Sequence, residues 1–168
     1  MGYEIERKFL VADDRWRQAA GAGETLRQGY LAGGVHGSVR VRASGGSAWL
    51  NIKGATVGAT RREFEYPIPL ADAAILLDEL CQRPLIEKTR YLVGHAGFTW
   101  EIDVFAGDNA GLVVAEIELE HADATFPHPE WLGIEVTEQP RYYNVSLVEH
   151  PYRNWSDAER AGHAASAG

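Results

Sequence analysis

Apolar and polar residues alternate with a period of two along most of the chain, a pattern typical of β-strands with two chemically different faces. Clusters of glycine and serine separate several of these segments, as expected for hairpin turns. The alternation predicts eight strands, at residues 3–11, 26–31, 38–43, 48–54, 61–67, 87–95, 98–105 and 113–121.

Helical periodicity is confined to shorter stretches. Residues 70–82 carry apolar side chains at steps of three and four, which predicts one amphipathic helix, and Pro84 lies just beyond its end. Antiparallel strands with a few helices at the rim indicate the α+β class. Three further short helices are predicted at residues 13–20, 142–149 and 156–164.

Length and composition describe one domain with a core of its own. The chain has 168 residues, of which 45% are apolar. We expect a single domain over residues 1–155, followed by a C-terminal tail, residues 156–168, that forms a short helix or is disordered. The single cysteine, Cys81, excludes an internal disulfide and a multi-cysteine metal site.

The charge of the chain limits its partners. Lys and Arg total 16 against 24 Asp and Glu, and the net charge of −8 has the wrong sign for general attraction to nucleic acid or an anionic membrane. The N-terminus is charged where a signal peptide is apolar, and no stretch approaches the ~20 apolar residues of a membrane span. We therefore expect a cytoplasmic protein without nucleic-acid or membrane partners.

The polar faces of the predicted strands carry charges almost throughout, and these charges are sorted by sign. Like charges two residues apart on one face repel each other unless an opposite strand or a counter-ion compensates them. A closed barrel with its charged face turned inward would supply that compensation. The basic positions are Arg40, Arg42, Lys53, Lys88 and Arg90, and the acidic positions are Glu4, Glu6, Glu63, Glu65, Glu101, Asp103, Glu116, Glu118 and Glu120.

Such a lumen would combine ligands for a polyanion with ligands for a hard cation. Arg binds phosphate through two parallel hydrogen bonds, and Lys binds it as a point charge. Mg²⁺ and Mn²⁺ prefer oxygen ligands, and Mg²⁺ is commonly held by one or two carboxylates together with phosphate oxygens of the substrate. The charge pattern therefore predicts a site for a polyphosphate that is bridged to the protein by a divalent metal.

The segment Glu4-Ile5-Glu6-Arg7-Lys8 resembles the N-terminal E-x-E-x-K signature of the CYTH superfamily, the triphosphate tunnel metalloenzymes. The resemblance continues in family order over residues 3–150. It implies an eight-stranded antiparallel β-barrel that forms a tunnel, in which a triphosphate is hydrolysed with Mg²⁺ or Mn²⁺. The further motifs include Leu26-Arg27-Gln28-Gly29-Tyr30-Leu31, Val39-Arg40-Val41-Arg42, Glu63-Phe64-Glu65, Glu87-Lys88-Thr89-Arg90, Glu101-Ile102-Asp103 and Glu116-Ile117-Glu118.

The resemblance also implies roles for individual residues. The residues that resemble ligands of the bridging metal are Glu4, Glu6 and Glu118. The residues that resemble an acidic set, which holds a second metal or orients the attacking water, are Glu63, Glu65, Asp103 and Glu116. The residues that resemble a polyphosphate clamp are Lys8, Arg40, Arg42, Lys53, Lys88 and Arg90, with Tyr30 as a further phosphate contact. Lys8 shares a strand face with the metal ligands, so we also expect it to stabilise charge on the leaving phosphate.

Several activities are compatible with this family, and we favour an inorganic triphosphatase. Gln28-Gly29-Tyr30-Leu31 and the N-terminal motif resemble the bacterial members with that activity. The alternatives are an organic triphosphatase acting on thiamine triphosphate or a nucleoside triphosphate, a class IV adenylate cyclase, and a non-catalytic polyphosphate-binding module. Gln139 departs from the family, which often has an acidic residue there. We expect a monomer or a homodimer.

Overall fold

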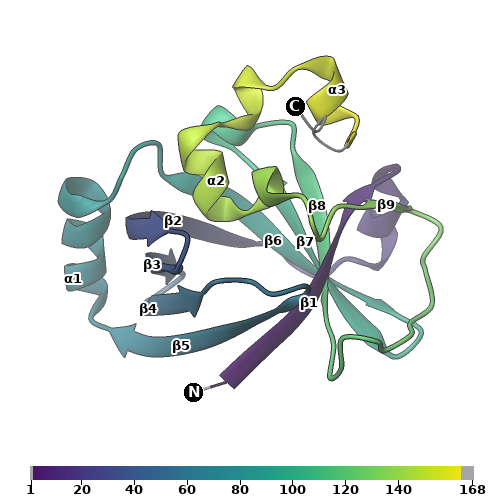
Figure 1. Cartoon of the computed structure of the whole chain (residues 1–168), viewed down its shortest axis with the longest axis horizontal. Helices are drawn as coiled ribbons and strands as arrows, with labels where there is room; N and C mark the ends of the chain where they lie inside the picture. The colour runs from purple at the N-terminus through teal and green to yellow at the C-terminus, as the bar shows by residue number, and fades with distance from the viewer. Residues whose placement is uncertain (1, 164–168) are drawn as a thin grey trace.

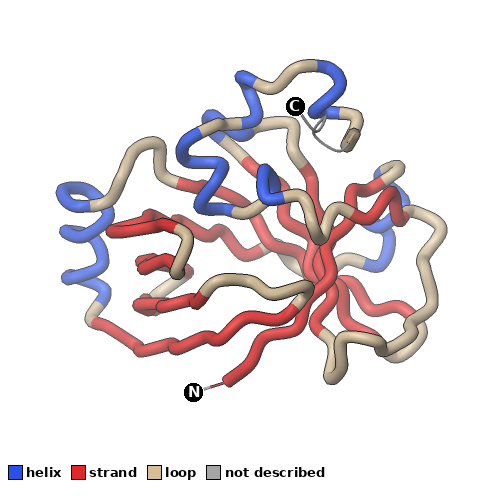
Figure 2. The backbone as a smooth tube through the Cα atoms, viewed as in Figure 1, coloured by secondary structure: helices blue, strands red, loops and turns tan. Residues whose placement is uncertain are grey.

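Hydrogen bonds between neighbouring antiparallel strands close the sheet into a barrel (Figures 1 and 2). The computed structural model describes residues 2–163. The strands of the barrel are β1 (Gly2–Val11), β2 (Glu24–Gly34), β3 (Gly37–Ser44), β4 (Ser47–Gly54), β5 (Thr60–Ile68), β6 (Ile86–His95), β7 (Phe98–Phe105) and β8 (Val113–Glu118). The predicted α+β class and eight-stranded antiparallel barrel are confirmed.

Strand β1 closes the barrel because it pairs along both of its edges. The strands follow one another in the order β5-β4-β3-β2-β6-β7-β8-β1, and β1 also pairs with β5. Residues 2–5 of β1 pair with β5, and residues 6–10 pair with β8. A ninth strand, β9 (Leu132–Glu135), pairs with β1 beyond this seam. The sequence did not predict β9, because four residues are too few to show a clear alternation.

The helices lie around the outside of the barrel and at its ends (Figure 2). The helix predicted at residues 70–82 consists of α1 (Leu70–Ile75) and a π-helical turn, η2 (Leu76–Leu80), so it ends two residues earlier than predicted. None of the helices within residues 2–163 is both long and apolar enough to cross a membrane. The other helical segments are η1 (Asp14–Ala19), η3 (Gly107–Asn109), η4 (Pro140–Tyr142), α2 (Asn144–Glu149), η5 (Tyr152–Asn154) and α3 (Asp157–Arg160).

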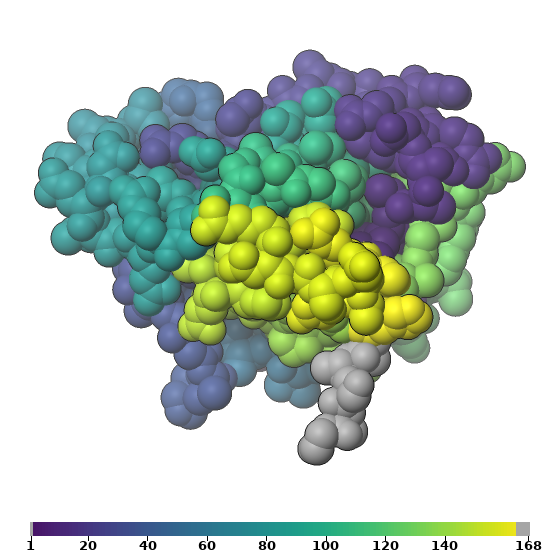
Figure 3. All heavy atoms as spheres, turned by 90° about the horizontal axis from the view of Figure 1, so that it is seen from above, coloured from purple at the N-terminus to yellow at the C-terminus, as the bar shows by residue number. Residues whose placement is uncertain are grey.

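The C-terminal segment contains a short helix that packs back onto the domain. Ser156 caps α3, because its hydroxyl accepts a hydrogen bond from the Glu159 N–H while the Glu159 carboxylate accepts one from the Ser156 N–H. The side-chain amide of Gln139 donates to the carbonyl of Gly162. Figure 3 shows this segment, in yellow, spread over one face of the molecule. Residue 164, the end of the predicted helix, lies outside the described residues.

Apolar side chains fill one end of the barrel from inside. This apolar plug consists of Tyr30, Ile86, Phe105, Leu112 and Val114 from the barrel. Val136, Tyr142, Leu147, Val148 and Trp155, from the part of the chain that follows β9, complete it. Side chains two residues apart share a strand face, so Ile86 and Phe105 lie on the same inner face as Lys88 and Asp103. Two other clusters pack against the outer face, one of them beneath α1. The lumen is therefore polar at one end and closed at the other.

Candidate active site

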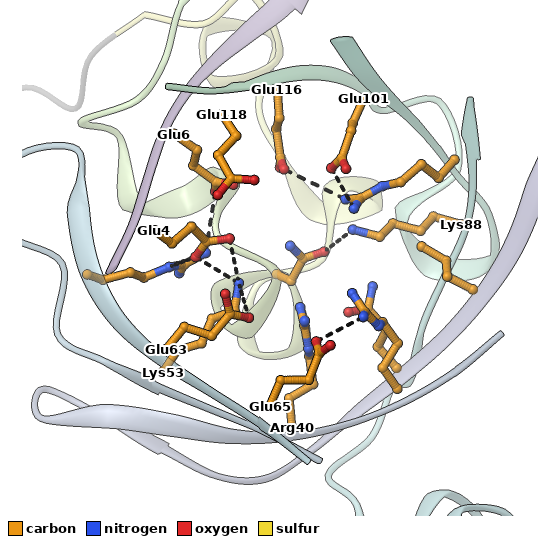
Figure 4. A pocket seen from close by; sticks show the side chains of 16 residues that line it. Glu4, Glu6, Arg40, Lys53, Glu63, Glu65, Lys88, Glu101, Glu116 and Glu118 are labelled. Carbon is orange, nitrogen blue, oxygen red and sulfur yellow. Dashed lines mark hydrogen bonds and ion pairs between the residues drawn. The ribbon is translucent and has the colours of Figure 1, made fainter. Parts of the chain in front are cut away.

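The part of the lumen above the apolar plug is a polar cavity of about 170 Å³ (Figure 4). Every strand of the barrel contributes to its wall, and the first residue of α2 also lines it. The lining residues are seven glutamates (Glu4, Glu6, Glu63, Glu65, Glu101, Glu116 and Glu118), six basic residues (Arg40, Arg42, Lys53, Arg61, Lys88 and Arg90), and Leu26, Gln28 and Asn144.

Strand register explains why charged residues from distant parts of the sequence meet. Glu6 of β1 lies directly opposite Glu118 of β8, so two like charges face each other. The next pair on the same face joins Lys8 to Glu116, which have opposite charges. Because each pair is set by backbone hydrogen bonds, the wall alternates between a repulsive position and a compensated one along this seam.

Glu4 is neutralised by two cations. Lys53 Nζ lies 3.0 Å from Glu4 Oε2, and Arg61 Nε lies 2.8 Å from the same oxygen. Burial acts to raise the pKa of Glu4, but these two neighbours outweigh it and lower the pKa to about 2. Glu4 is therefore ionised, and the protein itself engages its oxygens.

Glu6 and Glu118 carry charge that the protein does not fully compensate. Burial and the charge of Glu116 raise the pKa of Glu6 to about 7. Burial and the charge of Glu4 also raise the pKa of Glu118. A divalent cation between these two facing carboxylates would stabilise the ionised form of both.

The chemistry of these donors fits a hard divalent cation, although the side chains have to move to surround one. Within residues 2–163, no three acidic, histidine or cysteine side chains form a ready-made metal site. Glu4 is turned toward Lys53 and Arg61, while Glu6 and Glu118 lie on the adjacent part of the wall (Figure 4). Glu4, Glu6 and Glu118 would supply three carboxylates, which are the oxygen ligands that Mg²⁺ and Mn²⁺ prefer.

A second ion-pair network lies deeper in the wall. Lys88 Nζ lies 2.6 Å from Asp103 Oδ2, and Arg90 Nε lies 2.7 Å from Asp103 Oδ1. Lys8 Nζ lies 3.1 Å from Glu116 Oε1. Burial lowers the pKa of Lys88 to about 8 despite its carboxylate partner. The pKa of Glu116 falls below its usual range, because Lys8 and Arg90 outweigh the effect of burial.

Most of the residues predicted to form the site line the main cavity, and three do not: Lys8, Asp103 and Tyr30. Lys8 borders a smaller adjoining cavity of about 20 Å³, which shares Glu6 with the main one. Asp103 is only 1% exposed and sits behind Lys88. Of the outer acidic positions, Glu101 lines the main cavity and Glu120 borders a neighbouring surface pocket.

Tyr30 lies in the apolar plug, and its expected role as a phosphate contact requires correction. The residue is 4% exposed and packs with Ile86 and Phe105. It shares its strand face with Gln28, so the alternation placed it on the correct side of the sheet. Tyr30 lies deeper in the barrel than Gln28, at a level where the residues that follow β9 cover the inner face of the sheet. The structure therefore separates Tyr30 from the cavity.

Four polar residues near the cavity were not singled out from the sequence. Arg61 lies two residues before Glu63 and on the same strand face, so the alternation could have identified it. Asn51, whose side-chain amide donates to Glu65 at 2.6 Å, precedes Lys53 by the same step. Gln28 carries no charge, so a search for sorted charges passes over it. Asn144, whose Oδ1 accepts a hydrogen bond from Lys88, comes from a helix and has no strand pattern to reveal it.

The fold and the cavity define a class of barrel proteins whose internal site carries ligands for an anion and for a metal cation. A comparison with models of protein families matches the CYTH domain over residues 2–152. The chain belongs to the CYTH domain family.

Curated relatives and a solved structure extend this comparison. An inorganic triphosphatase of Acetivibrio thermocellus is 47% identical over 157 residues, which cover 94% of this chain and 100% of that protein. An inorganic triphosphatase of Nitrosomonas europaea is 38% identical over 151 residues, covering 86% of this chain and 96% of that one. The crystal structure of an inorganic triphosphatase superposes with a TM-score of 0.64 at 35% identity, over 88% of this chain and 95% of that chain.

Proposed function

We propose that the protein is a divalent-metal-dependent triphosphatase that hydrolyses inorganic tripolyphosphate to pyrophosphate and phosphate. The observation that carries this proposal is one enclosed cavity lined by seven glutamates and six basic residues. A protein that only bound a polyanion would be hindered by so many carboxylates, whereas a metal-bridged triphosphate uses both sets. The names of the two curated relatives support the same substrate.

We assign the metal, Mg²⁺ or Mn²⁺, to the carboxylates at the β1–β8 seam. Glu4, Glu6 and Glu118 would hold it, and the donor chemistry and raised pKa values described above support that assignment. When bound, the metal neutralises charge on the phosphoryl oxygens and lowers the pKa of a bound water. Glu116 and Asp103 are further candidate ligands, although both are engaged by basic side chains.

The basic side chains would bind and orient the phosphate chain. Arg40 is available at once, because it forms no ion pair with any residue in the range 2–163. The other members of the clamp, Arg42, Lys53, Lys88 and Arg90, together with Arg61, are held by carboxylates and would exchange these for phosphate oxygens. Lys8 would stabilise the negative charge that develops on the leaving phosphate.

Hydrolysis also needs a water in line with the scissile bond and an acceptor for its proton. We assign these tasks to Glu63 and Glu65, whose side chains are 26% and 42% exposed and so reach the solvent at the cavity opening. Arg42 and Asn51 both donate to Glu65 Oε2. This holds the carboxylate in place and leaves Oε1 to accept the proton.

A phosphate-release panel tests the proposal. Tripolyphosphate, ATP, thiamine triphosphate and pyrophosphate are each incubated with Mg²⁺, Mn²⁺ or EDTA. We expect tripolyphosphate to be cleaved faster than ATP, and no release in EDTA, because the cavity presents charge and few apolar surfaces for a base. Cyclic AMP as the main product from ATP would instead indicate a cyclase. Binding without any phosphate release would indicate a binding module.

The cytoplasmic location and the oligomeric state, monomer or homodimer, stay predictions.

A further inference from the structure

One buried amide in the cavity has no hydrogen-bond partner. Gln28 is 1% exposed, and within residues 2–163 neither its Nε2 nor its Oε1 has a partner. Its neighbour Gly29 faces outward, because a Cβ there would lie 2.6 Å from Cys81 beneath the outer helix. Gln28 therefore points into the lumen. A buried polar group without a partner costs on the order of 1–3 kcal/mol, so such a group needs an explanation.

The surroundings of Gln28 favour an anion as the missing partner. Gln28 lies opposite Arg42 in the β2–β3 register, and Arg40 is the next residue of β3 that lines the cavity. Nε of both arginines is buried without a partner among the described residues. The unpartnered donor atoms that line the cavity therefore lie on two adjacent strands. Arg42 still binds Glu65 through its terminal nitrogen, so Gln28 and Arg40 are the two side chains here without an ion pair or hydrogen bond among residues 2–163.

Gln28 and Arg40 lie at the closed end of the cavity, whereas Arg42 reaches toward Glu65 at the opening. Gln28 pairs in register with Ile86, a member of the apolar plug. Arg40 is 6% exposed, whereas the side chain of Glu65 at the opening is 42% exposed. Asn144, at the start of α2, closes this end further and holds Lys88 through a 3.1 Å hydrogen bond. A ligand that reaches Gln28 must enter from the opposite end and stop there.

We propose that Gln28 is a substrate-contacting residue that recognises the free terminal phosphate of the triphosphate and so sets the direction in which the substrate enters; this rests on the proposed triphosphatase function. Its Nε2 donates to one terminal oxygen while Arg40 binds the other two, and Oε1 accepts from the phosphate's hydroxyl or its hydration water. A terminal phosphate has three non-bridging oxygens for these donors. An esterified phosphate has only two, and its substituent would meet the plug.

The number of free phosphate ends then defines the class of substrate that can bind. Tripolyphosphate has two free terminal phosphates, ATP has one, and diadenosine triphosphate has none. Tripolyphosphate and ATP can place a free end at Gln28, with the nucleoside of ATP directed to the open end. Diadenosine triphosphate cannot, so we expect it not to bind.

The test measures binding in EDTA, so that it does not depend on turnover. Gln28→Met keeps the length of the side chain and removes both polar atoms. We expect it to weaken tripolyphosphate binding about 10- to 100-fold by calorimetry, the effect of losing one hydrogen bond to a charged group. Removing the unpartnered amide should also raise the melting temperature of the ligand-free protein. Gln18→Met, on the exposed surface, is the matched control and should change neither quantity.

Two results would overturn the inference. One is a Gln28→Met variant that melts at a lower temperature and binds tripolyphosphate normally, because Gln28 would then have a purely structural role. The other is wild-type protein that binds diadenosine triphosphate as well as it binds ATP. If the protein releases no phosphate with Mg²⁺ or Mn²⁺ but shows the expected binding pattern, the triphosphatase proposal fails and the recognition of a free phosphate end stands.

Discussion

Glu6 shows how a functional side chain can work against the stability of its own fold. Its pKa is raised to about 7 by burial and by Glu116, from the 4.5 of an ordinary glutamate. A carboxyl group with a higher pKa in the folded state holds its proton more tightly there, so folding is favoured as the pH falls. The contribution of Glu6 to stability is therefore lost as the pH rises from about 4.5 through 7.

The first prediction follows from that sign. In EDTA, Glu6→Gln should raise the melting temperature by a few degrees at pH 8, on the order of 2 kcal/mol, and change it little at pH 5, because a neutral amide replaces a charge that is disfavoured only at the higher pH. Thermal melts at both values measure this. Glu79→Gln, on the exposed side of η2, is the control. A lower melting temperature at pH 8 would contradict the prediction. Metal-dependent turnover should be lost in Glu6→Gln and kept in Glu79→Gln.

The second prediction separates binding from chemistry within the basic set. Arg40, which has no ion pair among the described residues, should hold phosphate equally in the ground and transition states, so Arg40→Ala should raise KM about 10- to 100-fold and leave kcat nearly unchanged. Lys8 borders the Glu6 side of the cavity, and Lys8→Ala should chiefly lower kcat. Steady-state kinetics on tripolyphosphate at saturating Mg²⁺, with Arg62→Ala as surface control, distinguish the two. A normal kcat with raised KM in Lys8→Ala would make Lys8 another clamp residue.

Strand alternation predicts which side of the sheet a residue occupies but not its depth along the barrel. That is why the face of Lys53 and Lys88 could be predicted from sequence, whereas Tyr30 was expected in the cavity and lies in the plug. Depth depends on which strands pair and where the C-terminal segment covers the lumen. These are long-range contacts that no local pattern contains. Asn144 was missed for the same reason, because it reaches Lys88 from a helix.

At the scale of elements, the sheet and its outer helices fit together through a few close approaches. Gly29 in β2 lies against Cys81, and α1 with η2 packs over β3 and β4 at this point. Strands with clear alternation and the helix at 70–82 were predictable, because one face of each is buried. Strand β9 and the π-helical turn η2 were not, since the first is very short and the second changes the hydrogen bonding without changing the apolar pattern.

The third prediction tests the approach at Gly29. Gly29→Ala would place a Cβ 2.6 Å from Cys81 Cβ, so the outer helix has to shift, and we expect a loss of about 1–3 kcal/mol in the free energy of unfolding. Denaturant titration measures it. Gly94→Ala in β6, where no atom lies within 4 Å of the added Cβ, is the matched control and should cost much less. Equal losses in the two variants would show that the strand tolerates the methyl group at Gly29. The variant protein that remains folded should keep its activity.

At the scale of the whole molecule, the barrel keeps a charged interior in a protein of net charge −8 by pairing its own charges. Glu4 is held by Lys53 and Arg61, and Asp103 by Lys88 and Arg90. A polyphosphate that binds the clamp residues other than Arg40 has to draw them away from these carboxylates, which then carry uncompensated charge. A divalent cation held by Glu4 has to draw that carboxylate away from Lys53 and Arg61. Polyphosphate binding therefore leaves carboxylates without a cation, and metal binding leaves Lys and Arg side chains without an anion. When both ligands are present, each compensates the charges that the other has exposed.

The last prediction follows from that exchange. An imido-bridged tripolyphosphate, which resists hydrolysis, and Mg²⁺ should each raise the melting temperature modestly when added alone, whereas together they should raise it by more than the sum of the two shifts. By linkage, Mg²⁺ should then tighten binding of the analogue by the same factor by which the analogue tightens binding of Mg²⁺. Thermal melts and calorimetry at constant ionic strength, with NaCl replacing MgCl₂ in the control, measure both quantities. Additive shifts would mean that the ion pairs of the empty cavity persist when the anion binds, and that the two ligands occupy independent sites.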